Sequence, residues 1–168
     1  DAPDGIALDS YLSHPKLIKA ANRRVNNRQQ TTWQTKPLEG ITLQGMMPRG
    51  DGIVPYISVS TASSWTDIGA WADGLFTPHI KLDEALRAEA KKIAASASSV
   101  EAKVKAVYAL LNNNVRYVFA HVGRGGYEPH SAPSVWENGY GDCKDQTVLV
   151  VALLRELGVT AYPALVAT

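Results

Sequence analysis

The sequence YGDCKDQTVLVVALLRELG, residues 140–158, decides how the second half of this chain is interpreted. Asp142 is a favourable N-cap residue, and Asp145 follows at the spacing of a capping box, so a helix is expected to begin here. The same pattern predicts that the helix runs from Asp142 to Leu157 and stops at Gly158. Apolar residues cover nearly all of its circumference, which predicts a position in the middle of the domain.

Cys143 occupies the first helical position of this segment. Free backbone N–H groups and the positive end of the helix dipole favour a thiolate there, and the thiolate is the nucleophilic species. The same N–H groups can stabilise an oxyanion. Asp142 and Asp145 oppose the thiolate and Lys144 favours it, so the sequence leaves the balance open. The alternative interpretation, a small buried apolar cysteine, stays open as well.

The segments around this helix also carry clear signals. Residues 64–75 predict a helix capped by Ser63 or Ser64 and closed by Gly74 and Pro78, and residues 82–94 predict another. Ser98 and Glu101 have the spacing of a capping box for a helix that ends at residues 112–114. Residues 115–120 predict a short strand, and 159–166 predict the start of another. A glycine-rich loop and a further loop over 121–141 lead from the first strand to the helix at Asp142.

The first fifty residues have a different character. His14 to Asn27 predicts a short helix, and Asn26 to Gly52 predicts an extended connector with at most short strands such as Gly40 to Gln44. Pro55 to Thr61 alternates apolar and polar residues, which favours a strand. The domain prediction is therefore an N-terminal extension or linker over 1–52 and a core over 53–168.

Composition excludes several classes of protein. The 168 residues include 17 basic and 16 acidic side chains, a net charge of +1, which gives no electrostatic reason to expect nucleic acid as a partner. No apolar run reaches the roughly 18 residues of a membrane-spanning helix, so no membrane insertion is expected. The single cysteine excludes an internal disulfide, and His121 and His130 fit no standard zinc spacing. We expect neither a metal nor a cofactor.

The motif YGDCKD resembles the active-site region of bacterial transglutaminase-like proteins. The resemblance runs through NVRYVFA and GRGGYEPHSAPSVWENGYGDCKD to the helix that follows, and the preceding IVPYISVSTASSWTDIGAWADGL is similar to the linker of such proteins. It covers Ile53 to Thr168. It implies an α+β, papain/transglutaminase-like helical subdomain with a central Cys-bearing helix and a truncated antiparallel sheet.

The resemblance also implies an activity. Proteins of this superfamily use a Cys-His-Asp triad for acyl transfer, meaning peptide or amide hydrolysis or transamidation, and Cys143 corresponds to the nucleophile. The histidine and aspartate follow the cysteine in that family, and no histidine follows Cys143 here. We therefore expect the core to be incomplete at its C-terminus and this chain to be inactive alone. Tyr140 and Trp136 are candidates for substrate binding or oxyanion stabilisation, and Asp142 and Asp145 for supporting the helix start.

Alternatives stay open at this point. His121 or His130 could act as a surrogate base in a permuted arrangement or simply pack the loop. The chain is part of an acyl-transfer enzyme, a non-catalytic module that binds protein or peptide, or a stable fragment without its own function. In the last case a strand edge at Val159 to Val166 could pair with a neighbouring copy. The resemblance further suggests a protein or peptide substrate and a periplasmic or cell-surface location.

Overall fold

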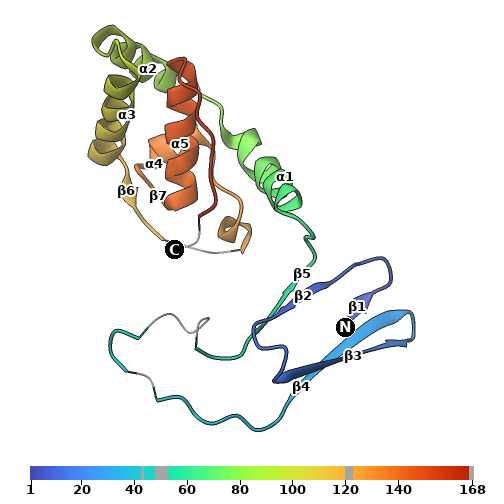
Figure 1. Ribbon diagram of the computed structural model, residues 1–168. Helices are drawn as coiled ribbons and strands as arrows, with labels where there is room; N and C mark the ends of the chain where they lie inside the picture. Colours follow the sequence, from blue (N-terminus) through green and yellow to red (C-terminus); the bar gives the residue numbers. More distant parts are fainter. Residues whose placement is uncertain (43, 48–52, 120–122, 167–168) are drawn as a thin grey trace. The chain divides into compact units, whose positions relative to one another are not determined.

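The computed structural model of the protein describes residues 1–42, 44–47, 53–119 and 123–166, which fold into an α+β structure (Figure 1). The chain forms two compact units, Asp1–Ile68 and Gly69–Thr168. This division differs from the boundary predicted at residues 52 and 53. The reason is strand β5 (Ile57–Ser60), which pairs antiparallel with β2 (Asp9–Leu12) and so belongs to the N-terminal unit.

The N-terminal unit is built from antiparallel strands. Strands β1 (Ala2–Pro3), β4 (Arg28–Thr35) and β3 (Ile18–Val25) form one sheet in the order β1-β4-β3. A two-residue turn joins β3 to β4, and its residues Asn26 and Asn27 have φ values of 48° and 56°. Two positive φ values are the requirement of a type I′ hairpin turn, a conformation that asparagine tolerates well.

Two predictions for this unit were wrong and one is confirmed. The segment His14 to Asn27 contains strand β3 in place of a helix, because the Asn26–Asn27 turn pairs eight residues of β3 with β4 and satisfies its backbone groups. For the same reason the predicted connector from Asn26 to Gly52 begins with a full strand. The described residues between Gly40 and Gln44 form no strand, and Leu43 lies outside them. The strand predicted within Pro55 to Thr61 is confirmed as β5.

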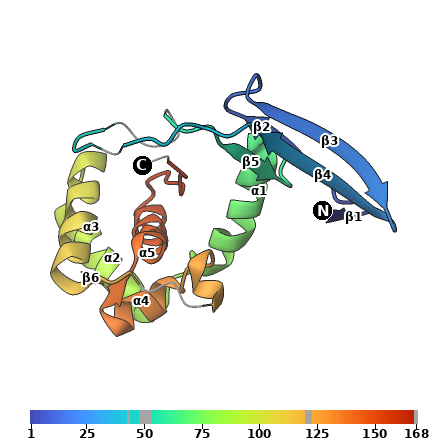
Figure 2. The same ribbon diagram turned by 90° about the horizontal axis from the view of Figure 1, so that it is seen from below.

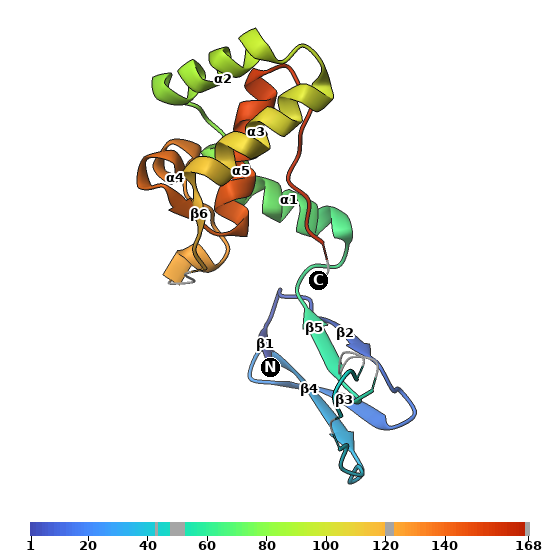
Figure 3. The same ribbon diagram turned by 90° about the vertical axis from the view of Figure 1, so that its left-hand side faces the viewer.

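The C-terminal unit packs helices around α5 (Cys143–Glu156). Helices α2 (Glu84–Ser96), α3 (Val100–Asn114) and α4 (Ala132–Asn138) each contact it, as Figures 1, 2 and 3 show. The remaining elements are α1 (Trp65–Phe76), the 3₁₀ turns η2 (Thr77–His79) and η3 (Gly123–Gly126), and strands β6 (Arg116–Tyr117) and β7 (Tyr140–Gly141).

The core of this unit confirms the central helix predicted from the sequence. Side chains of α5 are buried against those of α2, α3 and α4, and the most deeply buried are Leu86, Val107, Val135, Val148, Leu149 and Leu153. Burial of such side chains contributes roughly 1.5–3 kcal/mol each relative to exposure. Helix α5 is therefore held in place by apolar contact along most of its length, and its first residue is positioned with it.

Several details of the C-terminal unit differ from the sequence prediction. The cap of α3 is Ser99, whose hydroxyl accepts from the Ala102 N–H at 3.1 Å, and not Ser98. Residues 132–138, predicted as loop, form α4 because Ser131 caps it and Pro133 suits the first turn. Strand β6 covers only two residues of the predicted 115–120, and Ala120 lies outside the described part.

The predicted strand at Val159 to Val166 is absent, because no neighbouring strand among the described residues provides hydrogen-bond partners for it. The antiparallel sheets lie in the N-terminal unit, and the described C-terminal unit contains the parallel pair β6–β7. Self-association through residues 159–166 stays a prediction, now without a strand edge in that segment. Within the described residues, no helix is both long and apolar enough to cross a membrane.

Candidate active site

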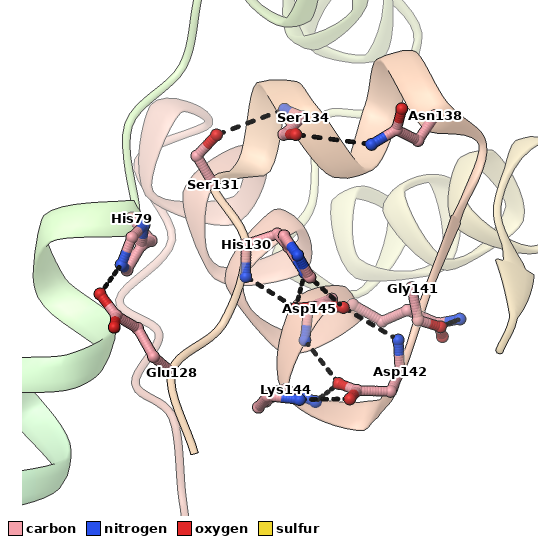
Figure 4. Close-up of polar contacts among 11 residues, drawn as sticks. His79, Glu128, His130, Ser131, Ser134, Asn138, Gly141, Asp142, Lys144 and Asp145 are labelled. Atoms are coloured by element: carbon pink, nitrogen blue, oxygen red, sulfur yellow. Dashed lines mark hydrogen bonds and ion pairs between the residues drawn. The ribbon is translucent and has the colours of Figure 1, made fainter. Parts of the chain in front are cut away.

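The start of helix α5 is fixed by a complete capping box. The buried Asp142 carboxylate accepts hydrogen bonds from the backbone N–H groups of Lys144 and Asp145, at 3.0 and 3.3 Å (Figure 4). In return, the Asp145 carboxylate accepts from the Asp142 N–H at 3.2 Å. Because each bond satisfies a backbone donor that the helix leaves unpaired, the first helical residue is unambiguous. It is Cys143, as predicted.

The cap uses the N–H groups on both sides of Cys143 but leaves the N–H of Cys143 itself outside the box. The Cys143 thiol is exposed. Cys143 therefore combines an accessible sulfur with a backbone donor at the positive end of a fourteen-residue helix. The interpretation of Cys143 as a buried apolar side chain is excluded by this exposure.

Tyr117, which the sequence analysis did not single out, lies on the strand that pairs next to the start of α5. Its phenol is close enough to Cys143 for the two side chains to influence each other electrostatically. Strand β6 places it there, because Tyr117 stands opposite Gly141 in the parallel pair and the Val118 N–H donates to the Gly141 carbonyl at 3.1 Å. Desolvation, followed by the charge of Cys143, raises the pKa of Tyr117 above its ordinary value. The phenol is thus a donor at neutral pH.

Gly141 allows strand β7 to approach the helix. A Cβ at this position would lie 2.7 Å from Asp145 Cβ and 3.2 Å from Val135 Cγ1, which is too close for any other residue. The sequence signal for this packing was the glycine directly before Asp142. The close approach matters for the site because Gly141 is the pairing partner of Tyr117 in the β6–β7 pair.

A buried ion pair lies next to the cysteine. The Lys144 ammonium contacts the Asp142 carboxylate, and both side chains are at least nine-tenths buried (Figure 4). A buried carboxylate beside Cys143 would disfavour a thiolate, and a paired ammonium offsets that charge. The sequence analysis listed Asp142 and Lys144 as charges with opposite effects on the Cys143 thiol. In the structure these two charges form one ion pair.

His130 is bound to Asp145 on another side of the helix. The Asp145 carboxylate accepts from the His130 backbone N–H at 2.8 Å and lies 3.2 Å from the ring nitrogen Nδ1 (Figure 4). Residues two apart on a helix point about 200° apart, so Asp145 and Cys143 face in nearly opposite directions. His130 consequently holds the loop before α4, and the geometry disfavours it as a surrogate base for Cys143. His121, the other candidate, lies outside the described residues.

The pKa of the Asp145 carboxyl is set by these contacts. Burial by itself would raise its pKa, but hydrogen bonds from the backbone N–H groups of His130 and Asp142, together with the His130 side chain, lower it below its ordinary value. Asp145 is therefore the charged centre of the cap. Its predicted role as a support of the helix start agrees with these bonds.

Cys143 lines a groove of about 460 Å³ between α3, α5 and the segment after α5. The groove is apolar along most of its length and carries two tyrosines and two polar side chains; its lining is Val104, Tyr108, Leu111, Cys143, Gln146, Thr147, Val150, Val151, Leu154, Ala161 and Tyr162. Among the described residues, no three histidine, cysteine or acidic side chains come together as metal ligands.

The two predicted aromatic residues lie apart from this groove. Trp136 packs against the hydrophobic core, and Tyr140 stands opposite Arg116 on β7. Within the described part of the chain, no hydrogen bond joins either side chain to Cys143, and their assignment to substrate binding stays a prediction. His79, the third histidine of this unit, is paired with Glu128 at 3.2 Å (Figure 4).

Comparison with known proteins agrees with this fold. Residues 87–164 match the model of the transglutaminase-like superfamily, the family that the YGDCKD motif resembles. The matched range includes the whole of α3, α4 and α5. A search of curated proteins gave no match.

The chain is also similar in structure to a protein of Parabacteroides distasonis ATCC 8503 that is described as a "putative protease". The TM-score is 0.78 at 18% sequence identity, a likeness of fold. The similarity covers 93% of this chain but only 30% of that protein. This chain therefore spans less than a third of the length of the protein that it resembles.

Proposed function

We propose that this chain carries the nucleophile of a cysteine acyl-transfer enzyme that hydrolyses or transamidates peptide or amide bonds. The observation that carries the proposal is the environment of Cys143: an exposed thiol at the first residue of α5, beside a backbone N–H that the cap leaves available. The match of residues 87–164 to the transglutaminase-like superfamily supports the same assignment.

The reaction follows from this geometry. The Cys143 thiolate bonds to the carbonyl carbon, and the π electron pair moves to the carbonyl oxygen, which becomes an oxyanion. When the oxyanion collapses, the C–N bond breaks and the amine leaves after gaining a proton. The thioester on Cys143 then reacts with water, giving hydrolysis, or with a second amine, giving transamidation. The Cys143 N–H, which the capping box leaves outside, stabilises the negative oxygen.

The thiol proton must be taken up by a general base, which then donates it to the leaving amine, and the described residues place no such base beside Cys143. In the C-terminal unit, His130 is bound to Asp145 and His79 to Glu128. We propose that a histidine and an acidic residue in another part of a longer protein complete the triad, and that this chain alone turns over slowly. The share of the P. distasonis protein that the chain spans supports this proposal.

The nature of the substrate and the location are also proposals. A protein or peptide substrate suits an open groove more than 300 Å³ in volume beside the thiol. The superfamily resemblance suggests action in the periplasm or at the cell surface. A non-catalytic module that binds peptides is the alternative, and the experiment below separates the two.

The test uses the fact that Cys143 is the only thiol of the chain. The rate of alkylation by iodoacetamide at pH 7 is measured on the folded chain and on the same chain unfolded in denaturant, which provides a matched reference thiol. We expect the folded chain to react about 10-fold faster, since a helix start favours the thiolate. Mass spectrometry after p-nitrophenyl acetate treatment should show one acetyl group on Cys143, and none with Cys143→Ser.

Equal alkylation rates in the two states, with no acetylated Cys143, would contradict the proposal. The peptide-binding alternative would then be preferred, and it predicts that Cys143→Ala leaves binding intact.

A further inference from the structure

The long hairpin of the N-terminal unit concentrates positive charge. Residues 16–36, which span β3 and β4, contain six basic side chains and no acidic one, although the whole chain has a net charge of only +1. The basic residues are Lys16, Lys19, Arg23, Arg24, Arg28 and Lys36. Two of them are paired, with Asp4 and Asp1. Within the described residues, Lys19 and Arg23 have no carboxylate partner, so strand β3 carries two cations that the chain itself leaves uncompensated.

Strand β3 also forms an open edge of its sheet. The order β1-β4-β3 places it last, and no strand of the described residues pairs with its outer side (Figure 2). The two-residue turn after Val25 makes Val25 and Arg28 a hydrogen-bonded pair, and the bonds to β4 alternate along the strand from there. The N–H and C=O groups of Ala20, Asn22 and Arg24 therefore point away from β4, toward the open edge.

The charges and the edge together define the segment that would fit. Lys19 and Arg23 are four residues apart on a strand, so their side chains lie on the same face. A strand added antiparallel to β3 would place two of its own residues, also four apart, directly opposite them at Cβ distances of about 4.5–5.5 Å. Acidic residues at those positions would form two cross-strand pairs of opposite charge, while the backbone of the added strand would bond to the free groups of β3.

Other occupants of this edge fit less well. Every charged residue of β3 is basic, so a second copy of the strand would bring like charges together and supply none of opposite sign. Basic side chains on an edge strand protect against such self-pairing. A polyanion without peptide groups would meet the cations but would leave unpaired the N–H and C=O groups, which repeat at the spacing of a peptide backbone. An acidic peptide segment satisfies both features.

We propose that the outer edge of β3 is a docking site for an extended acidic segment of another protein, which adds to the sheet as a fourth strand and pairs its carboxylates with Lys19 and Arg23. Main-chain hydrogen bonds give the affinity of such a contact, and the charges select the partner. The site belongs to the N-terminal unit and does not depend on the function proposed for Cys143.

The test titrates the ¹⁵N-labelled chain at neutral pH with two synthetic octapeptides that are blocked at both ends. The peptide TEVTVETS carries two glutamates four residues apart, and TKVTVKTS carries lysines in their place. We expect TEVTVETS to bind at least about 5-fold more tightly, because two cross-strand pairs change from repulsion to attraction. The amide shifts that it causes should concentrate on Ala20, Asn22 and Arg24, and its affinity should fall as salt is raised.

Two variants separate the charges from the edge itself. Lys19→Glu/Arg23→Glu should reverse the preference, so that TKVTVKTS binds more tightly. The matched control, Lys81→Glu/Lys91→Glu, makes the same change of net charge at exposed residues of the C-terminal unit and should keep the wild-type preference. Asn22→Pro keeps both cations but removes an outward N–H, which an edge strand tolerates, and should weaken TEVTVETS binding at least about 10-fold. The amide spectrum of β4 verifies that each variant is folded.

Each outcome supports or overturns the proposal. Selective binding of TEVTVETS along β3, with a reversed preference in the double variant, supports it. Equal affinities for the two peptides, or no binding of either, would overturn it. Full affinity in Asn22→Pro would overturn it too, because the peptide would then be held by charge without joining the sheet. Shifts of the β3 amides that depend on chain concentration without peptide would identify a second copy as the occupant and contradict the proposal.

Discussion

The two units of this chain are stabilised in different ways. In the C-terminal unit, seventeen apolar side chains of the described residues are buried, nearly all of them on helices that pack around α5. Among the described residues of the N-terminal unit, only Ala2 and Ile18 are buried to that degree. Its strands are held by backbone pairing, and seven of the eight residues of β3 are exposed. Apolar burial therefore dominates in one unit and backbone hydrogen bonding in the other.

This difference explains why the helices were easier to predict from the sequence than the strands. A buried helix stripe repeats every three to four residues and is visible in a single sequence, because the core selects apolar residues at that spacing. An exposed hairpin places no such requirement on its side chains. Its existence depends on long-range pairing and on the turn, and only the turn leaves a local signal.

The largest effect is expected from removing core volume in α5. Leu153 is 1% exposed, and Leu153→Ala should lower the free energy of unfolding of the C-terminal unit by about 2–5 kcal/mol, the cost of lost apolar contact plus a cavity. Urea titration followed by far-UV circular dichroism measures the loss, since helices dominate that signal.

The matched control in the N-terminal unit is Leu38→Ala, which makes the same change at a residue that is 48% exposed. It should change the free energy of unfolding by less than about 0.5 kcal/mol. Losses of similar size for the two variants would show that the units do not differ in the way described.

An intermediate effect is expected at Asp145. Asp145→Asn removes the charge that accepts from the Asp142 and His130 N–H groups and should cost about 1–3 kcal/mol at pH 7. Because the pKa of Asp145 is lowered in the folded chain, its stabilisation is complete above the ordinary carboxyl pKa of about 3.9 and is lost as pH falls through the folded value. The variant should therefore lose less stability than the wild type between neutral pH and acid.

Asp73→Asn, on the exposed surface of α1, is the control for this charge change. Urea titrations at pH 7 and at successive steps below pH 4 provide the comparison. An acid profile of Asp145→Asn that parallels the wild type would mean that other carboxyl groups account for the acid sensitivity.

The smallest effect is expected in the β3–β4 turn. Glycine is preferred at the second central position of a type I′ turn, so Asn27→Gly should stabilise the hairpin by roughly 0.5 kcal/mol. Asn27→Val should destabilise it, since a β-branched residue is strained at positive φ. Hydrogen exchange of the β3 and β4 amides, read by mass spectrometry, should slow in the first variant and quicken in the second, with exchange in α5 unchanged in both.

In the C-terminal unit the sequence predicted α5 closely, because both its cap and its apolar circumference are local features. Helix α4 was missed because seven residues are too few for a periodic signal. The N-cap residue Ser131 is the local signal that could have predicted it. The absent strand at Val159 to Val166 shows the opposite error: its composition favours a strand, but a strand also needs a partner.

The site was predicted in the same uneven way. Cys143, Asp142 and Asp145 were singled out because the capping box that starts the helix lies within four consecutive residues. Tyr117 was missed because it is brought beside Gly141, near the start of α5, by the parallel pairing of residues that are 24 positions apart in the sequence. No periodic or capping signal marks such a contact, although the predicted strand over 115–120 had placed Tyr117 on the correct element.

The exposed, solitary thiol has a consequence for oxidation chemistry. Peroxide converts a thiolate to a sulfenic acid, which a neighbouring thiol normally condenses with to give a disulfide. This chain has one cysteine, so an oxidised Cys143 has no thiol of its own chain to resolve it. Its recovery depends on an external thiol, and without one the oxidation proceeds to the irreversible sulfinic acid. The exposure that makes the Cys143 thiol accessible to reagents therefore also leaves it unprotected against oxidants.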